Sequence, residues 1–381
     1  MTTAWLAGSG LTPYGRLEGQ TTLDLMTRAA AAAINDAGLE RRDIDGLICG
    51  YSTTLPHIML STLFAEHFGL KPTYAHAVQV GGATGLAMAM LAATLVRAGA
   101  ARNVLVVAGE NRLTGQSRDA TMQTLAQAGH ERFEVPLGLT IPAYYGLVAS
   151  RYMHEYGLTE PDLAELAVLM RRHASAHPGA QLRDPVTVEE VLASKPIAPP
   201  LKLMDCCPIS DGGAAFVFSR DRVSPHALAA RGAAQAHTHQ HVSGAEDLTR
   251  FGAQAAARSA LAQSGARVGD IGYAGIYDSF TITLAILLEE IGFCGRGEAG
   301  TRAASGHFGP DGAVPLNTHG GLLSYGHCGV GGALAHLAEA HVQLTGRAGG
   351  RQIGSEPALA LLHGDGGIMS SHVSLVLERV S

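Results

Sequence analysis

Lysine is scarce in this 381-residue chain, which has only three lysines among its 27 basic residues. None of them (Lys71, Lys195 and Lys202) lies in a glycine-rich turn, so a Schiff-base mechanism has few candidates. Charged residues make up only 16% of the chain, the formal net charge is −6, and no basic run occurs. This balance argues against a surface that binds nucleic acid.

Paired cysteines and long apolar runs are also missing. The five cysteines show no spacing suited to a zinc site or a disulfide framework. Apolar runs such as 104–108 are far shorter than the roughly 20 residues that a membrane span needs. The N-terminus has no basic segment followed by an apolar one. We therefore expect a cytoplasmic protein with reduced thiols and no membrane span.

Motifs for a bound metal or nucleotide are absent as well. His237, His239 and His241 alternate with other residues and would share one face of a strand, which we interpret as surface strand or loop rather than a metal site. The glycines of 81–85 lack the spacing of a dinucleotide-binding loop. No bound cofactor and no metal are expected.

The chain is apolar and long enough to hold more than one hydrophobic core. Apolar residues make up 46% of the sequence. A single core seldom serves a chain of this length, so we expect a globular protein with two domains.

An internal repeat divides the chain into two similar halves. In the first half, a helix is expected to end before Gly38 and a short strand to follow Asp43. In the second half, Gly265 and Asp270 occupy the same places at a constant offset of 227 residues. A repeat of this size indicates duplicated domains.

Each half continues with a glycine-rich loop, a helix and a continuous apolar strand. These three parts cover 81–85, 86–98 and 103–108 in the first half, and 326–332, 333–344 and 358–362 in the second. The pattern is typical of α/β proteins, whose strands lie in a sheet covered on both faces.

The halves are expected to span residues 1–225 and 226–381. Residues 113–208 break the pattern, since they carry a tyrosine cluster and a helical stretch around 163–173. We interpret them as an insertion that lies over the core, because long insertions in compact domains are often functional.

The segment 317–332 combines six glycines with two histidines, a tyrosine and a cysteine. It reads Asn-Thr-His-Gly-Gly-Leu-Leu-Ser-Tyr-Gly-His-Cys-Gly-Val-Gly-Gly. Glycines let the backbone turn sharply and approach a ligand. Histidine, tyrosine and cysteine are groups that move protons or attack carbonyls, so this segment predicts an active site.

Three segments resemble the thiolase superfamily, and within it the sterol-carrier-protein-type thiolases. Residues 205–215 are similar to that group's Cys-Cys-Pro-x-Ser-Asp-Gly segment, 277–280 stand where it has His-Asp-Cys-Phe, and 317–328 are similar to its Asn-Pro-x-Gly-Gly and Gly-His-Pro motifs. The resemblance covers almost the whole chain. It implies an α/β fold, a five-layered αβαβα sandwich built from two duplicated halves with an inserted loop domain, and usually a homodimer.

The departures from the family pattern bear on the chemistry. Gly82 stands where thiolases carry their nucleophilic cysteine before a helix, a place that favours a thiolate. Ser279 stands at the second family cysteine, and Tyr277 at the neighbouring histidine. The family's His327 and a C-terminal glycine loop at 363–367 are retained.

Several side chains near these loops are candidates for proton transfer. His327 is expected to act as a base or an oxyanion donor, because neutral imidazole takes a proton near pH 7. Tyr277 would donate a hydrogen bond, or accept a proton if its pKa is lowered. Further candidates for direct roles, each with packing as its alternative, are Tyr325, His363 and His319.

Other residues are expected to bind rather than react. Gly82 and the pair Gly366–Gly367 are expected to offer backbone N–H groups to a thioester oxygen, which requires no side chain. Asp278 is expected to orient its neighbours. The remaining residues expected at the acyl-CoA site are Ser279, Tyr144 and Tyr145.

Glycine cannot form an acyl-enzyme, so the sequence favours chemistry on acyl-CoA thioesters without a covalent intermediate. Retro-aldol cleavage of a β-hydroxyacyl-CoA, or its reverse, fits an oxyanion hole and a base. The resemblance supports this, since thiolase relatives that lack the cysteine act as aldolases and pair with a small zinc-ribbon/OB-fold protein. Coenzyme A would enter as part of the substrate.

Two alternatives remain open at this point. Cys328 follows His327 directly and would serve as a relocated nucleophile in an acyltransferase, although a small buried packing role is its other interpretation. Cys206 and Cys207 lie in a segment that looks structural. The second alternative is a non-catalytic acyl-CoA-binding or scaffold subunit.

Overall fold

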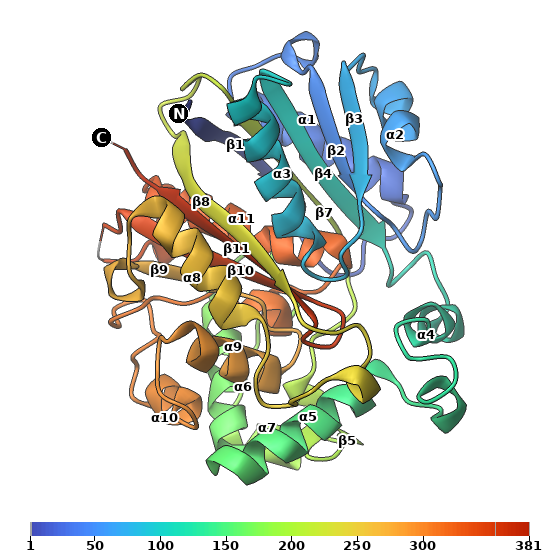
Figure 1. Cartoon of the computed structure of the whole chain (residues 1–381), viewed down its shortest axis with the longest axis vertical. Coiled ribbons are helices and arrows are strands. Elements are labelled where there is room, and N and C mark those ends of the chain that lie inside the picture. The colour runs from blue at the N-terminus through green and yellow to red at the C-terminus, as the bar shows by residue number, and fades with distance from the viewer. Residues whose placement is uncertain (1, 355, 381) are drawn as a thin grey trace.

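A nine-stranded mixed sheet organises the protein, whose computed structural model describes residues 2–354 and 356–380 (Figure 1). The strands follow the order β3-β2-β4-β7-β1-β8-β11-β10-β9. Their bounds are β1 Ala4–Leu11, β2 Gly46–Gly50, β3 Tyr74–Val78, β4 Asn103–Asn111, β7 Asp211–Ser219, β8 Leu228–His237, β9 Tyr273–Ile276, β10 Leu359–Gly366 and β11 Ser371–Glu378. A separate small pair is formed by β5 Pro196–Ala198 and β6 Leu201–Lys202.

The two halves of this sheet meet at β1 and β8. The pairing there is antiparallel and covers three residue pairs, from Ala4 with Ala230 to Leu6 with Leu228. In the first half, β2 runs parallel to β3 and β4; in the second, β9 runs parallel to β10. The duplicated halves therefore share one continuous hydrogen-bonded sheet.

Helices form three layers around the half-sheets. The helices α3 Thr84–Ala98 and α11 Val330–Leu344 contact each other and strands of both halves, so they form the central layer. The outer layers are α1 Thr22–Asp36 with α2 Leu60–Phe68, and α8 Ala253–Ser264 with α9 Thr281–Ile291. The result is an αβαβα arrangement of five layers.

The apolar composition of α3 follows from its central position. Within the described part of the chain, the segment Gly81–Ala98, with mean hydropathy 1.3, is the one stretch long and apolar enough to cross a membrane. Its residues pack against strands of both half-sheets, where apolar side chains are needed on several faces. This packing explains why Gly81–Ala98 is so apolar: α3 is a helix of the protein core.

The structure confirms the internal repeat in detail. Short 3₁₀ turns at 41–43 and 268–270 precede β2 and β9, which begin at Gly46 and Tyr273, again 227 residues apart. Gly38 and Gly265 both adopt the left-handed region, with φ of +69° and +72°. Glycine is favoured there because it has no Cβ.

Residues between β4 and β7 form the helical insertion at the lower end of Figure 1. It contains α4 Arg118–Ala126, α5 Ile141–Tyr156, α6 Glu160–Ser175 and α7 Val188–Ala193, and the short α10 Ala299–Ala304 packs against α6. The helix expected around 163–173 lies inside α6. Figure 1 shows α4 at the right, apart from the other insertion helices. The boundary at residue 225 and the insertion limits stay predictions.

Candidate active site

The predicted site lies where both central helices begin. Gly82 precedes α3, His327 precedes α11, Tyr277 follows β9, and the turn at Gly366–Gly367 ends β10. The backbone N–H of Tyr277 donates to the carbonyl of His363 at 2.9 Å, which holds the tyrosine beside that last turn. The repeat therefore brings equivalent loops of both halves together.

Tyr277 and His327 form a hydrogen-bonded pair. The Tyr277 Oη atom lies 3.0 Å from His327 Nε2. The backbone N–H of Gly329 donates to His327 Nδ1 at 3.2 Å, so the neutral ring carries its proton on Nε2. His327 thus donates to the phenol oxygen, and the phenol proton is left to face a ligand.

Burial keeps both members of this pair uncharged near neutral pH. Desolvation, followed by the positive charge of Arg112, lowers the pKa of His327 to about 3. Desolvation and the nearby Asp365 raise the pKa of Tyr277 well above 10, while Arg112 opposes the rise. Of the two roles expected for Tyr277, the one that depends on a lowered pKa does not match this environment, because burial outweighs the arginine. Hydrogen-bond donation is the form that the environment favours.

Gly82 faces the Tyr277 hydroxyl directly. A Cβ built on Gly82 would lie 2.6 Å from Tyr277 Cζ and even closer to Oη and to the carbonyl of Asp365. Such distances are far inside van der Waals contact. The tyrosine therefore fills the space that a side chain at residue 82 would need, so glycine here and tyrosine at 277 are sterically linked.

None of the thiols is prepared for nucleophilic attack. Burial raises the pKa of Cys328 to about 12, and its Sγ lies against Gly331 in a cluster with Tyr14 and Tyr325. Burial likewise raises the pKa values of the other four thiols. A thiol with so high a pKa holds almost no thiolate at neutral pH.

Two glycine turns touch at the site. A Cβ on Gly81 would lie 2.7 Å from the nitrogen of Gly367, and one on Gly366 would lie 3.1 Å from the nitrogen of Ala83. Gly367 also has φ of +70°. Only glycines permit this close backbone contact, which places the loop before α3 against the end of β10.

Tyr145 and Tyr144, both expected at the substrate site, point in different directions. The Tyr145 hydroxyl lies 3.1 Å from Asp365 Oδ2 and 3.2 Å from the carbonyl of Gly367, and its ring stacks on Phe280 at 4.3 Å. Tyr145 therefore ties the insertion to the glycine turn. Tyr144 instead lies beside Glu134 within the insertion, which helps raise its pKa to about 12 after burial itself.

Asp278 and Ser279 continue from Tyr277 into the core. Asp278 accepts from the backbone N–H groups of Leu322 at 2.7 Å and Leu323 at 3.4 Å, so it holds the turn that leads to His327. This contact agrees with an orienting role. Ser279 is 6% exposed, and its carbonyl accepts from the N–H of Cys207 at 3.0 Å.

The structure does not bring Tyr325, His319 or His363 side chains to the Tyr277–His327 pair. The Tyr325 hydroxyl donates to the carbonyl of Thr12 at 3.3 Å, and the His319 ring packs 5.3 Å from the Tyr325 ring. His363 Nδ1 lies 2.8 Å from Ser374 Oγ, on the other side of β10 from α3. Direct roles for these three side chains stay predictions.

The sequence did not single out Ser210 or Arg112. The backbone N–H of His327 donates to Ser210 Oγ at 2.9 Å, and the N–H of Ser210 donates back to the His327 carbonyl at 3.1 Å. Ser210 belongs to the 205–215 segment that carried the family resemblance, and that membership was the available signal. Arg112 follows β4, and no motif marks it.

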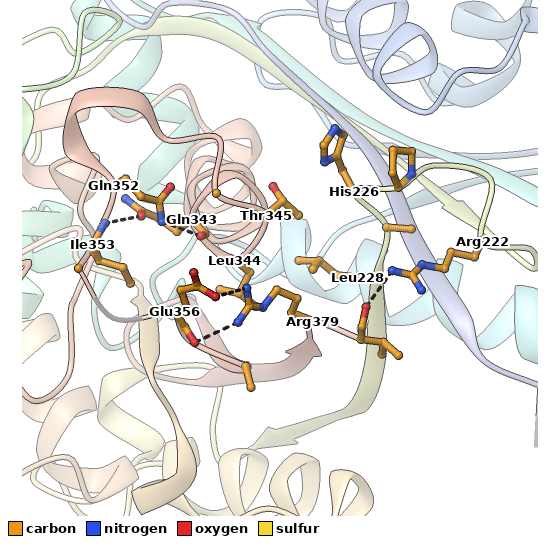
Figure 2. Close-up of a pocket in the computed structure, with 16 residues that line it drawn as sticks. Arg222, His226, Leu228, Gln343, Leu344, Thr345, Gln352, Ile353, Glu356 and Arg379 are labelled. Carbon is orange, nitrogen blue, oxygen red and sulfur yellow. Dashed lines mark hydrogen bonds and ion pairs between the residues drawn. The ribbon is translucent and has the colours of Figure 1, made fainter.

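A cavity of about 630 Å³ lies far from this pair, at the other end of α11 (Figure 2). Its lining includes Arg222, Gln343 and Arg379, and Arg379 is engaged by Glu356 at 2.9 Å. A helix of this length separates its two ends by about 20 Å. No predicted site residue lines this cavity. Among residues 2–354 and 356–380, no group of three potential ligands is arranged to hold a metal.

Comparisons with known proteins agree with this geometry. A family model described as the thiolase N-terminal domain matches residues 6–222, and one described as thiolase C-terminal domain-like matches residues 234–379. The chain belongs to the thiolase family. The five-layered thiolase fold expected from the sequence is thereby confirmed.

Relatives within the family have different activities. The chain is 33% identical to an acetyl-CoA acetyltransferase of Methanothermobacter thermautotrophicus, over 96% of this chain and 97% of that protein. It is 36% identical to a steroid side-chain-cleaving aldolase of Thermomonospora curvata, over 84% and 85%. A solved structure described as the Ltp2-ChsH2(DUF35) aldolase superposes with a TM-score of 0.86 at 32% identity, covering 99% of this chain and 98% of that one.

Proposed function

We propose that this thiolase-family protein cleaves or forms a carbon–carbon bond in a β-hydroxyacyl-CoA without a covalent intermediate. The observation that carries the proposal is the Tyr277 hydroxyl, which stands in the space of a side chain at Gly82 and bonds to His327. An acyl-enzyme needs a nucleophile there, and glycine offers none. The aldolase relatives support the same reaction class.

Tyr277 is the proton carrier in the proposed cleavage. Its phenolate, a minor form at neutral pH because burial raises the pKa of Tyr277, takes the proton of the β-hydroxyl group. The Cα–Cβ bond then breaks, and the released electron pair forms the thioester enolate. The carbonyl product leaves, and the phenol then returns the proton to Cα. His327 Nε2–H donates to the phenolate oxygen throughout, which stabilises the charged form of Tyr277.

The backbone N–H groups at Gly82 and Gly366–Gly367 are proposed to hold the enolate oxygen. The contact between these two turns would place their amides on one side of the substrate. This function needs no side chain, so it is compatible with the loss of the cysteine. Tyr145 keeps the second turn in place through its bond to the Gly367 carbonyl.

A panel of thioesters tests the reaction. The protein would be incubated with β-hydroxyacyl-CoAs, including one with a steroid side chain, and separately with β-ketoacyl-CoAs plus free coenzyme A. We expect release of acyl-CoA from at least one β-hydroxy substrate, insensitive to iodoacetamide. Efficient thiolysis of a β-ketoacyl-CoA, with no cleavage of any β-hydroxyacyl-CoA, would contradict the proposal.

An acyltransferase is the second candidate, because relatives with acetyl-CoA acetyltransferase activity are similarly close. It would require Cys328 or another thiol as the nucleophile. A covalent acyl adduct detected by mass spectrometry on intact protein would favour it. Binding of acyl-CoA with no turnover in any assay, unchanged by His327→Ala, would favour a non-catalytic subunit instead.

We also propose two protein contacts. In the described part of the chain, the edge strand β3 has β2 as its one neighbour, and the exposed Ile58 and Met59 lie in the loop between β2 and α2, which suits a homodimer. The two-component aldolase neighbour supports a small zinc-ribbon/OB-fold partner. Light scattering tests the first contact. Co-purification with a small protein encoded beside this gene tests the second.

A further inference from the structure

Arg112 is a nearly buried arginine beside the candidate active site. It directly follows β4, and its side chain is 10% exposed. Its Nε atom donates to Thr53 Oγ1 at 3.2 Å and lies 3.3 Å from Glu110 Oε2. Within residues 2–354 and 356–380, these are its only polar contacts, so Nη1 and Nη2 have no partner there.

Glu110 contacts Arg112 at Nε and, among the parts of the chain that the structure describes, leaves Nη1 and Nη2 of the guanidinium without an ion pair. Glu110 Oε1 is engaged by the backbone N–H of Thr53, by Thr53 Oγ1 at 2.7 Å and by Ser52 Oγ at 3.3 Å. Its other oxygen lies 3.3 Å from Arg112 Nε and accepts no hydrogen bond from the described residues. Nη1 and Nη2 are not fully buried, so a ligand can reach them, and the planar fork of a guanidinium matches a carboxylate or other oxyanion.

Two observations place Arg112 near the reacting groups. A Cβ on Gly329 would lie 2.6 Å from Glu110 Cδ, so the Glu110 carboxylate touches the turn whose N–H bonds to His327. The positive charge of Arg112 also acts on both groups: it adds to the effect of burial in lowering the pKa of His327, and it opposes the larger effect of burial, which raises the pKa of Tyr277. A ligand in contact with Tyr277 would therefore lie within reach of this charge.

We propose that Nη1 and Nη2 of Arg112 bind an oxyanion of the substrate. Two sources have the same chemistry: a carboxylate carried by the acyl fragment, or the enolate oxygen that forms on cleavage. The second source rests on the proposed aldol reaction, whereas the first is a property of binding alone.

Ligand binding separates the two sources. Affinities for succinyl-CoA and butyryl-CoA, which differ in a terminal carboxylate, would be measured by calorimetry for the wild type, Arg112→Gln and Arg112→Lys. If a substrate carboxylate is the ligand, succinyl-CoA binds about tenfold tighter in the wild type and Arg112→Gln abolishes the preference. Arg112→Lys keeps a charge but loses the two-point contact, so it retains part of the preference.

Kinetics report the other source. If the enolate is the ligand, neither thioester is preferred, and Arg112→Gln lowers kcat for cleavage about 100-fold with KM little changed. Arg102→Gln is the matched control, because Arg102 directly precedes the same strand and forms an exposed pair with Asp221. Equal effects of both substitutions, or no effect of Arg112→Gln on binding and kcat, would overturn the proposal. If Arg112→Gln does not fold, Arg112→Lys alone decides by the same two readouts.

Discussion

The two glycine-rich loops that precede α3 and α11 have equivalent places in the repeat but different chemistry. The loop before α11 retains His327, whereas the loop before α3 has Gly82 where the family carries its nucleophile. Tyr277, from the second half, occupies the space that this glycine leaves. The comparison shows that the duplicated backbone can be kept when one loop loses its reactive side chain. A residue from the other half then fills the space of that side chain.

Removing the Tyr277 hydroxyl is expected to have the largest effect on this arrangement. Tyr277→Phe keeps the ring but loses the proton carrier, so kcat for cleavage should fall about 1000-fold. The melting temperature and acyl-CoA affinity should change little, and both would be measured beside the rate. A loss of less than tenfold would show that Gly82 and Tyr277 are linked by packing alone.

The pH dependence tests whether Tyr277 or His327 is the base. Burial raises the pKa of Tyr277 well above 10, so the phenolate fraction grows about tenfold per pH unit below that value. We expect kcat to rise about 100-fold from pH 7 to pH 9 without a plateau. His327, with a pKa of about 3, stays neutral over this range and should add no inflection near pH 6.5. A bell-shaped profile centred near neutrality would point to His327 instead.

Restoring the family cysteine tests the steric link between Gly82 and Tyr277. Gly82→Cys should destabilise the protein by about 1–3 kcal/mol, because its Cβ meets Tyr277 and the carbonyl of Asp365. Urea denaturation gives this free energy. The double variant Gly82→Cys with Tyr277→Ala should recover part of the loss, since the ring no longer occupies the space. Full stability in the single variant would contradict the link.

The smallest effect is expected at Cys328, which directly follows His327 in the second loop. Cys328→Ala should change kcat less than about twofold, because a buried thiol with a pKa of about 12 takes no part in attack. Activity with iodoacetamide present serves as a second measurement. Loss of activity in this variant, with the melting temperature unchanged, would favour the acyltransferase alternative.

Much of the fold was predictable because it repeats. The matched glycines at 38 and 265 and the apolar strands mark elements that local backbone chemistry determines. The junction of β1 with β8 was not predictable, because three pairs of backbone hydrogen-bonding residues leave no side-chain pattern. The resemblance named Tyr277 and His327, but their contact across 50 residues is visible only in the folded chain.

Side-chain direction explains why other site predictions lack support. His363 and Gly364 are neighbours on β10, yet a Cβ on Gly364 faces α3 while His363 points to Ser374. Alternation along a strand separates such neighbours by the whole thickness of the sheet. A role for Arg112 could not be predicted from the sequence for a related reason. The proposed role depends on which of its nitrogen atoms already have hydrogen-bond partners, and sequence spacing carries no such information.

The pairing of α3 with α11 has an electrostatic consequence. Both helices are 15 residues long and begin at the site, so the positive ends of their macrodipoles both lie there. Each N-terminus carries the equivalent of about half a positive charge. Two such ends converge where a thioester would become anionic. The duplication therefore supplies a permanent positive field that belongs to the backbone, and that field survives any exchange of the side chains around it.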